Sequence, residues 1–111
     1  MIDLDPPEEV SAKRRELYAL HSKLCGRAFE LMRRKNIDYA TDDDPLWNFR
    51  RFGADGILIR MDDKLSRLLR FVDTGEFKVT EENLDDTILD IINYAVLLHF
   101  YLSDLRKEIG Q

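Results

Sequence analysis

The stretch LDDTILDIINYAVLLHFYL at residues 84–102 decides the fold. It lies within a predicted helix over about residues 81–108, on which apolar side chains occupy nearly every side. A helix that is apolar on most sides must be buried on most sides. Three long helices in a chain of 111 residues can hardly enclose it. We therefore expect a helical protein that associates as a homodimer or homotetramer.

Two further amphipathic helices are predicted before this stretch. One runs over about residues 6–35, and the other over residues 57–74, where Thr74-Gly75-Glu76 breaks the helical pattern. Residues 36–56 lose the helical spacing and contain the turn signal DDDP at residues 42–45. No useful length of sequence alternates as a strand would. The sequence predicts one all-α domain over residues 1–111, a bundle of three to four helices completed by oligomerisation.

Charge and cysteine content exclude several classes of protein. The 17 Lys and Arg residues against 22 Asp and Glu residues give a net charge of −5, so no direct binding of a nucleic-acid polymer is expected. The single Cys25 excludes an intramolecular disulfide framework. The N-terminal residues lack the features of a signal peptide, and the apolar run at residues 94–102 is too short to span a bilayer. We expect a cytoplasmic protein without membrane contact.

Four polar side chains on the last predicted helix do not suit an apolar core. Glu82, Asp86, Asp90 and Asn93 are spaced by four, four and three residues, which places them on one helix face. Like charges at this spacing repel, and the cost increases if the face is buried. Positive charge should therefore lie opposite this face.

Two sources of that positive charge are open. A divalent cation can be held by this face together with Asp62 or Asp63, because hard cations prefer oxygen ligands. Alternatively, the second predicted helix can pair with the face through Arg60, Lys64 and Arg67 and form an interhelical salt-bridge network. Spacing alone favours the salt-bridge network over the metal site. The position of the acidic stripe on the most apolar helix brings the two interpretations closer to each other.

Three blocks of the sequence resemble a known family. They are KNIDY at residues 35–39, GILIRMDDKLSRL at residues 56–68 and ENLDDTILDIINYA at residues 82–95. The third block matches in order and spacing over its whole length. In these blocks the chain resembles the nucleotide-modification-associated domain one family, small proteins common in phages. Its last helix is similar to that of the all-α nucleoside triphosphate pyrophosphohydrolases, the MazG- and dUTPase-like group.

The resemblance implies a Mg²⁺-dependent site between helices that splits a (d)NTP into a monophosphate and pyrophosphate, in nucleotide-pool control or modified-base metabolism. The catalytic carboxylates would be Glu82, Asp86 and Asp90, and these three with Asp63 would hold the metal. Bound Mg²⁺ would polarise the α-phosphoryl group and activate a water molecule. Glu82 or Asp38 would accept the proton of that water.

The remaining implied residues would bind the substrate. Lys64, Arg60 and Arg67 would neutralise the β- and γ-phosphates. Asn93 would bind a sugar hydroxyl or orient the ligand, and Tyr39 or Trp47 would stack on the base.

Two other classes of function stay open. The chain can be a nucleotide-binding or sequestering module without hydrolysis, since the second predicted helix is poor in carboxylates. It can also be a structural or partner-binding helical protein in which the charged residues form an ion network. Dependence on Mg²⁺ separates the first two classes from the third, and turnover separates the enzyme from the binding module.

Overall fold

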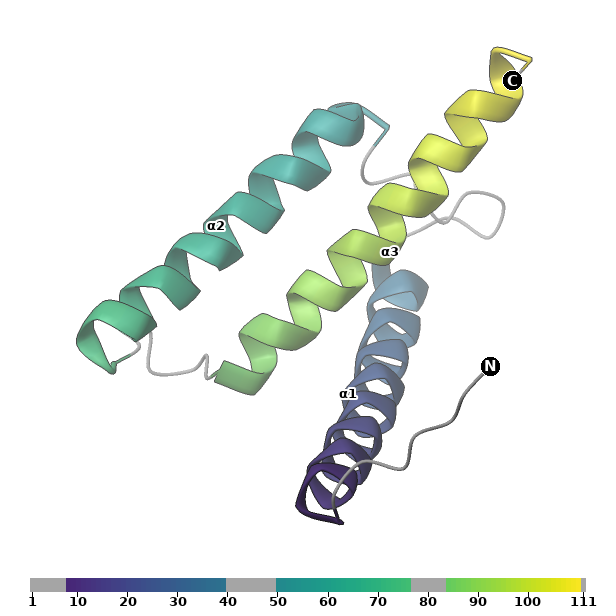
Figure 1. Cartoon of the computed structure of the whole chain (residues 1–111). Coiled ribbons are helices and arrows are strands. Elements are labelled where there is room, and N and C mark those ends of the chain that lie inside the picture. The colour runs from purple at the N-terminus through teal and green to yellow at the C-terminus, as the bar shows by residue number, and fades with distance from the viewer. Residues whose placement is uncertain (1–7, 40–49, 77–83, 111) are drawn as a thin grey trace.

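Three helices make up the described part of the chain, with α3 between the other two (Figure 1). The structure is a computed structural model that describes residues 8–39, 50–76 and 84–110. The helices are α1 (Glu8–Tyr39), α2 (Gly53–Thr74) and α3 (Leu84–Glu108). No strand occurs in these ranges, which confirms the predicted all-α class.

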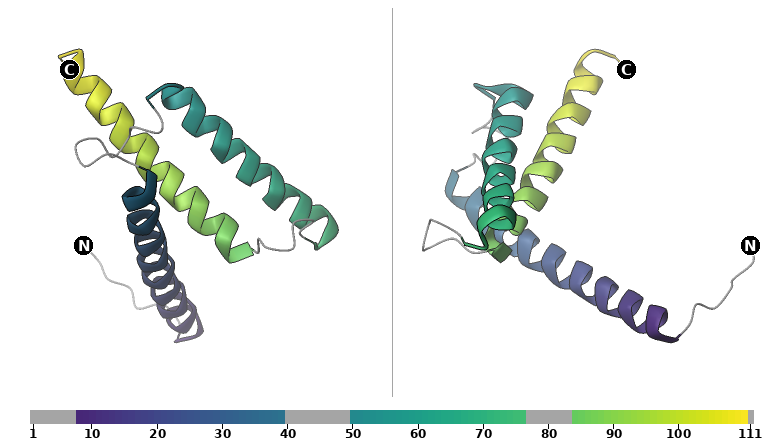
Figure 2. Two further views of the ribbon diagram at one scale, coloured as in Figure 1. Left: turned by 180° about the vertical axis from the view of Figure 1, so that it is seen from behind. Right: turned by 60° about the vertical axis from the view of Figure 1, so that its left-hand side comes forward.

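The arrangement is open. Helix α2 lies antiparallel beside α3, whereas α1 crosses α3 steeply and its N-terminal half projects away from the pair (Figure 2). Residues 12–23 of α1 are all exposed. The radius of gyration is 17.8 Å, whereas a compact domain of about 100 residues has a radius near 13 Å.

The buried core lies where the three helices meet. Each helix contributes one fully buried apolar residue: Ala28 from α1, Ile57 from α2 and Leu89 from α3. Thr87 of α3 is also buried. This core is small, since many of the large apolar side chains on all three helices are exposed.

The boundaries of α1 and α2 correct the predicted loop over residues 36–56. Helix α1 continues to Tyr39, because no Gly or Pro interrupts its last turn. Helix α2 begins at Gly53 instead of residue 57. Gly53 has φ +62°, and a Cβ atom there would lie 3.0 Å from the Tyr101 hydroxyl of α3. A Cβ atom on Gly56 would lie 2.5 Å from that of Phe52. Both glycines therefore permit close approach at the start of α2.

The end of α2 confirms the predicted break. Gly75 adopts the left-handed conformation with φ +76°, and its N–H donates to the Phe71 carbonyl at 2.7 Å. This is the common way in which a glycine closes a helix C-terminus.

Helix α3 ends at Glu108 as predicted but is much less buried than the sequence suggests. Its buried residues are Thr87, Leu89 and Asn93. The expected burial on most sides is therefore not reached within one chain, because α1 and α2 cover only part of the helix. The apolar run over residues 94–102 lies inside this longer helix. The continuous 25-residue helix is long and apolar enough to cross a membrane by length and composition, a property it shares with core helices of water-soluble proteins.

Candidate functional site

Asp90 lies at the junction of all three helices. Its Oδ2 is 2.8 Å from Nζ of Lys64 on α2, and its Oδ1 is 3.5 Å from Nζ of Lys35 at the C-terminal end of α1. The side chains of Lys64 and Asp90 are only 14% and 15% exposed, whereas that of Lys35 is 54% exposed. The sequence left open whether a divalent cation or basic side chains neutralise the acidic stripe. In the described structure, two lysines lie against Asp90.

Asn93, one turn after Asp90, joins α3 to α1. Its Nδ2 donates a 3.0 Å hydrogen bond to the Ala28 carbonyl oxygen in the middle of α1. Both residues are buried, and the small side chain of Ala28 allows the two helices to approach closely. The Asn93 amide predicted to contact substrate therefore holds α1 across α3.

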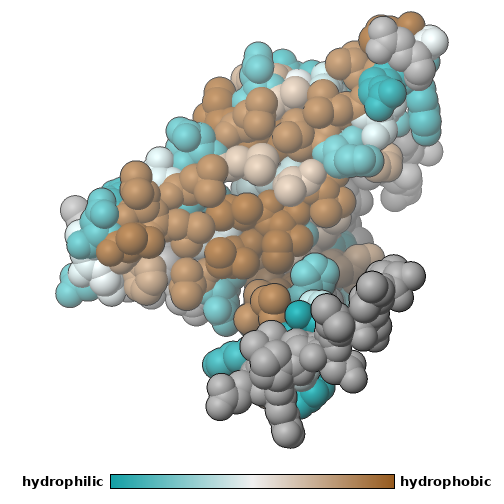
Figure 3. All heavy atoms as spheres, in the orientation of Figure 1, coloured by the Kyte–Doolittle hydropathy of each residue, from teal (hydrophilic) through white to brown (hydrophobic). Residues whose placement is uncertain are grey.

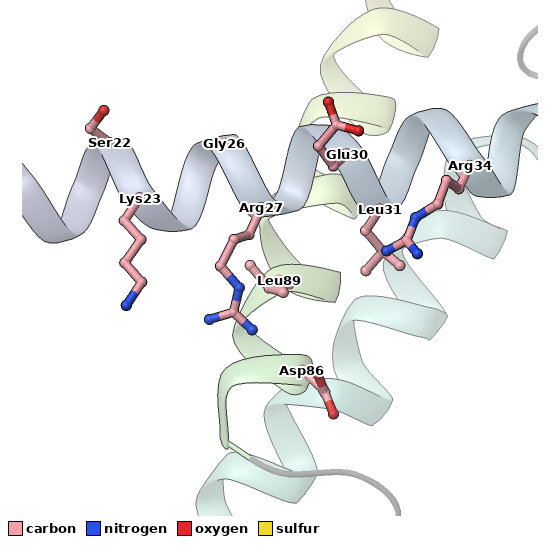
Figure 4. A pocket seen from close by; sticks show the side chains of 9 residues that line it. All are labelled: Ser22, Lys23, Gly26, Arg27, Glu30, Leu31, Arg34, Asp86 and Leu89. Carbon is pink, nitrogen blue, oxygen red and sulfur yellow. The ribbon is translucent and has the colours of Figure 1, made fainter.

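A basic hollow of about 490 Å³ lies beside this crossing. Helix α1 lines it with three cations, and α3 contributes Asp86 and Leu89. Figure 4 shows Lys23, Arg27 and Arg34 directed from α1 toward the side where Asp86 lies, while the Glu30 carboxylate points the other way. The hollow thus presents several positive charges and a half-buried carboxylate.

Two of the three cations keep their charge available for a ligand. Arg27 pairs with Asp85, Nη1 to Oδ2, at 3.2 Å. Within the described ranges, Lys23 and Arg34 form no ion pair. These two side chains lie about 16 Å apart along α1, so an anionic group at either end of the hollow would meet one positive charge without breaking an existing pair.

The other predicted substrate cations lie on α2. Arg60 is exposed, and Arg67 is half-buried on the same helix face as Lys64. Asp63, a predicted metal ligand, is exposed on α2. Lys64 forms an ion pair with Asp90 on the acidic face of α3.

Several predicted site residues lie outside the described residues. Trp47 and Glu82 belong to undescribed ranges. Asp38 and Tyr39 end the backbone of α1, but their side chains lie outside the described part of the structure. Their predicted roles in proton transfer, metal binding and base stacking stay predictions.

The described carboxylates do not form a metal site that the protein alone would hold. No group of three or more His, Cys, Asp or Glu side chains gathers within the described ranges. Asp86 and Asp90 are one helical turn apart on α3, but Lys64 and Lys35 lie against Asp90. Mg²⁺ commonly uses only one or two carboxylates, completing its shell with waters and substrate phosphates. A metal ion at this face would therefore depend on Asp86 and on the phosphates of a bound ligand.

The sequence analysis missed the basic residues of α1. Lys23, Arg27 and Arg34 recur at spacings of four and seven residues, which places them along one helix face. That spacing was the available signal. It could not show that this face crosses α3 beside Asp86, because the crossing depends on tertiary contacts between residues 65 positions apart, such as Asn93 and Ala28.

Comparisons with known proteins leave this site without a counterpart: no family model, curated protein or solved structure matches the chain.

Proposed function

We propose that this protein binds nucleoside triphosphates in the basic hollow between α1 and α3 and, with Mg²⁺, hydrolyses them to a monophosphate and pyrophosphate. The observation that carries the proposal is the juxtaposition of uncompensated cations on α1 with Asp86 on α3. The hollow volume of about 490 Å³ falls in the range of small-molecule sites.

The cations of α1 would bind the phosphate chain. An arginine binds a phosphate through two parallel hydrogen bonds, and a lysine contributes a point charge. Arg34 would bind the β- and γ-phosphates in the first way, and Lys23, about 16 Å further back along the helix, would contact another part of the ligand. Lys64 would act indirectly, because its ammonium group is already held by Asp90 at 2.8 Å.

Asp86 is the first metal ligand in this proposal. It is half-buried at the edge of the hollow, where a carboxylate and phosphate oxygens can share one cation. Bound Mg²⁺ supplies the polarisation of the phosphoryl group and the activation of water. Asp90 would set the position of the junction, since two lysines already neutralise its carboxylate.

Nucleotide binding without hydrolysis is the second candidate. It is favoured by the pairing of Asp90 with Lys64 and Lys35, which leaves fewer carboxylates for a catalytic metal. A sequestering module needs only the cations and the hollow.

The test is incubation of the purified protein with each (d)NTP, with and without Mg²⁺, while monophosphate and pyrophosphate release are measured. The same nucleotides are titrated in parallel by calorimetry. The informative variant is Lys23→Gln/Arg34→Gln, and its matched control is Lys13→Gln/Arg14→Gln. The control removes one lysine and one arginine from exposed positions of the same helix, outside the hollow.

Metal-dependent release that is lost in Lys23→Gln/Arg34→Gln and kept in the control would support hydrolysis in the hollow. Saturable binding with the same variant pattern, but without release, would support the binding module. Absence of both turnover and binding in a folded protein would overturn both candidates.

A further inference from the structure

Helix α3 carries an apolar seam that neither α1 nor α2 buries. The seam residues alternate at spacings of four and three along the helix: Leu84, Ile88, Ile91, Ala95, Leu98, Leu102 and Leu105. This spacing is the heptad pattern by which one helix packs against another. None of the seam residues is buried, and Leu102 is 41% exposed.

A second apolar ridge on α2 extends the same surface. Leu58, Leu65 and Val72 recur every seven residues and are all exposed. Because α2 runs antiparallel to α3, helical geometry places this ridge on the same side of the pair as the seam, away from α1. Figure 3 shows apolar residues gathered across α2 and α3 on one face.

The exposed area of the chain is large enough for an interface with a partner protein. The chain exposes 9053 Å², whereas a compact monomer of its mass would expose about 6,400 Å². The difference is about 2,700 Å² per chain, and a standard protein interface removes about 800 Å² from each partner. A standard interface would therefore cover about a third of this excess area, and one partner of the size of this chain can supply it.

Charge along α3 indicates that the partner helix runs in the opposite direction. The first turn of α3 carries Asp86 and Asp85, which pairs with Arg27 of the same chain, and its last turn carries Arg106 and Lys107 beside Glu108. In an antiparallel pair of α3 helices, Asp86 of each copy would lie near Arg106 and Lys107 of the other. A parallel pair would bring the two Asp86 carboxylates together, which is unfavourable.

We propose that the apolar face of α2 and α3 binds a second copy of this chain about a twofold axis, with the two α3 helices antiparallel. The seam of each copy fills the space left open in the other and completes a helical bundle. The antiparallel register centred on Ala95, which packs seam against seam, places Ile88 opposite Leu102 of the second copy.

The first experiment measures mass in solution at micromolar concentration by light scattering, for the full chain and two variants. Leu102→Glu places a charge in the seam. Val96→Glu is the matched control, because Val96 is an even more exposed apolar residue of α3, at 53%, but lies off the seam. Leu102→Glu should raise the dissociation constant of the assembly about 100-fold or more, because each copy would bury a charge. The control should leave that constant unchanged.

A second experiment keeps the direction of pairing testable if the charged variant fails to fold. Cys25, which is exposed, is first changed to Ser. In that background, Ile88→Cys/Leu102→Cys should form a disulfide-linked dimer under mild oxidation, while each single cysteine variant should not. Cross-linking by either single variant would show parallel pairing and overturn the proposed arrangement.

Two further results would overturn the proposal. One is a wild-type protein with the mass of one 13.1 kDa chain. The other is an assembly that Leu102→Glu leaves intact while its far-ultraviolet circular dichroism shows it folded. A monomer that sediments with phosphatidylcholine vesicles, and loses that property in Leu102→Glu, would assign the seam to a membrane surface instead.

Discussion

Removing either partner of the Lys64–Asp90 pair should destabilise the protein about as much as removing both. The two charges are 2.8 Å apart, and each side chain is about one-seventh exposed. At that separation the Coulomb attraction is about 6 kcal/mol for an effective dielectric constant near 20. The cost of taking both charges out of water cancels most of that attraction.

The relevant quantity is therefore the coupling between the two residues. Lys64→Met leaves the Asp90 carboxylate largely buried beside the more distant Lys35, and Asp90→Asn removes the carboxylate that lies 2.8 Å from the Lys64 ammonium group. Each single change should cost about 2 kcal/mol, because it strands a largely buried charge. The double variant should cost about 2 kcal/mol rather than the sum, which gives a coupling free energy near 2 kcal/mol.

Urea denaturation followed by circular dichroism measures this cycle, with the protein concentration held constant because the chain is proposed to associate. Each single variant should move the midpoint by about 1 M urea. The matched control is the exposed pair Lys13–Glu16, at 3.4 Å, in a cycle of Lys13→Met and Glu16→Gln. Its coupling should not exceed about 0.5 kcal/mol. If the Lys64–Asp90 coupling were as small as that of the control, the junction would be solvated and the reasoning from burial would be wrong.

Three other changes test separate parts of the structure. Asn93→Leu should lower stability by about 1–3 kcal/mol, because it removes the hydrogen bond to the Ala28 carbonyl from a buried site; no change in the urea midpoint would contradict the role of Asn93 in holding α1. Gly26→Ala should stabilise the chain by about 1 kcal/mol, since a Cβ atom there has no neighbour within 4 Å in the middle of α1. Gly56→Ala should destabilise it, and Phe52→Gly should recover part of the loss, because the added Cβ atom meets the Phe52 side chain at 2.5 Å. Thermal melts of the two glycine variants that move in the same direction would count against this account.

Features that depend on residues close to one another along the sequence could be predicted. The break after α2 follows from Gly75, whose left-handed conformation few other residues adopt at low cost. The end of α3 at Glu108 also agrees with the sequence, because the helical pattern continues to that point. The all-α class follows from the long helical patterns alone.

Features fixed by tertiary contact were not predictable. Gly53 and Gly56 look like loop residues in the sequence, and only the positions of Tyr101 and Phe52 show that they permit the first turn of α2. For the candidate site, the stripe containing Asp86 and Asp90 was evident, as was a lysine opposite it. The basic hollow could not be predicted, because Lys23 and Arg34 line a hollow only where α1 crosses α3.

The contact between Asn93 and Ala28 makes α1 a lever with its fulcrum near the basic hollow. Twenty residues separate Ala28 from the start of α1 at Glu8, which is about 30 Å of helix at 1.5 Å per residue. A tilt of 10° about that contact would move the N-terminal end of α1 by about 5 Å, because 30 Å of helix lie between them. Residues 12–23 are exposed and do not hold that end in place. A ligand between Arg34 and Asp86 that changed the crossing angle slightly would therefore cause a much larger displacement at the N-terminal end of α1.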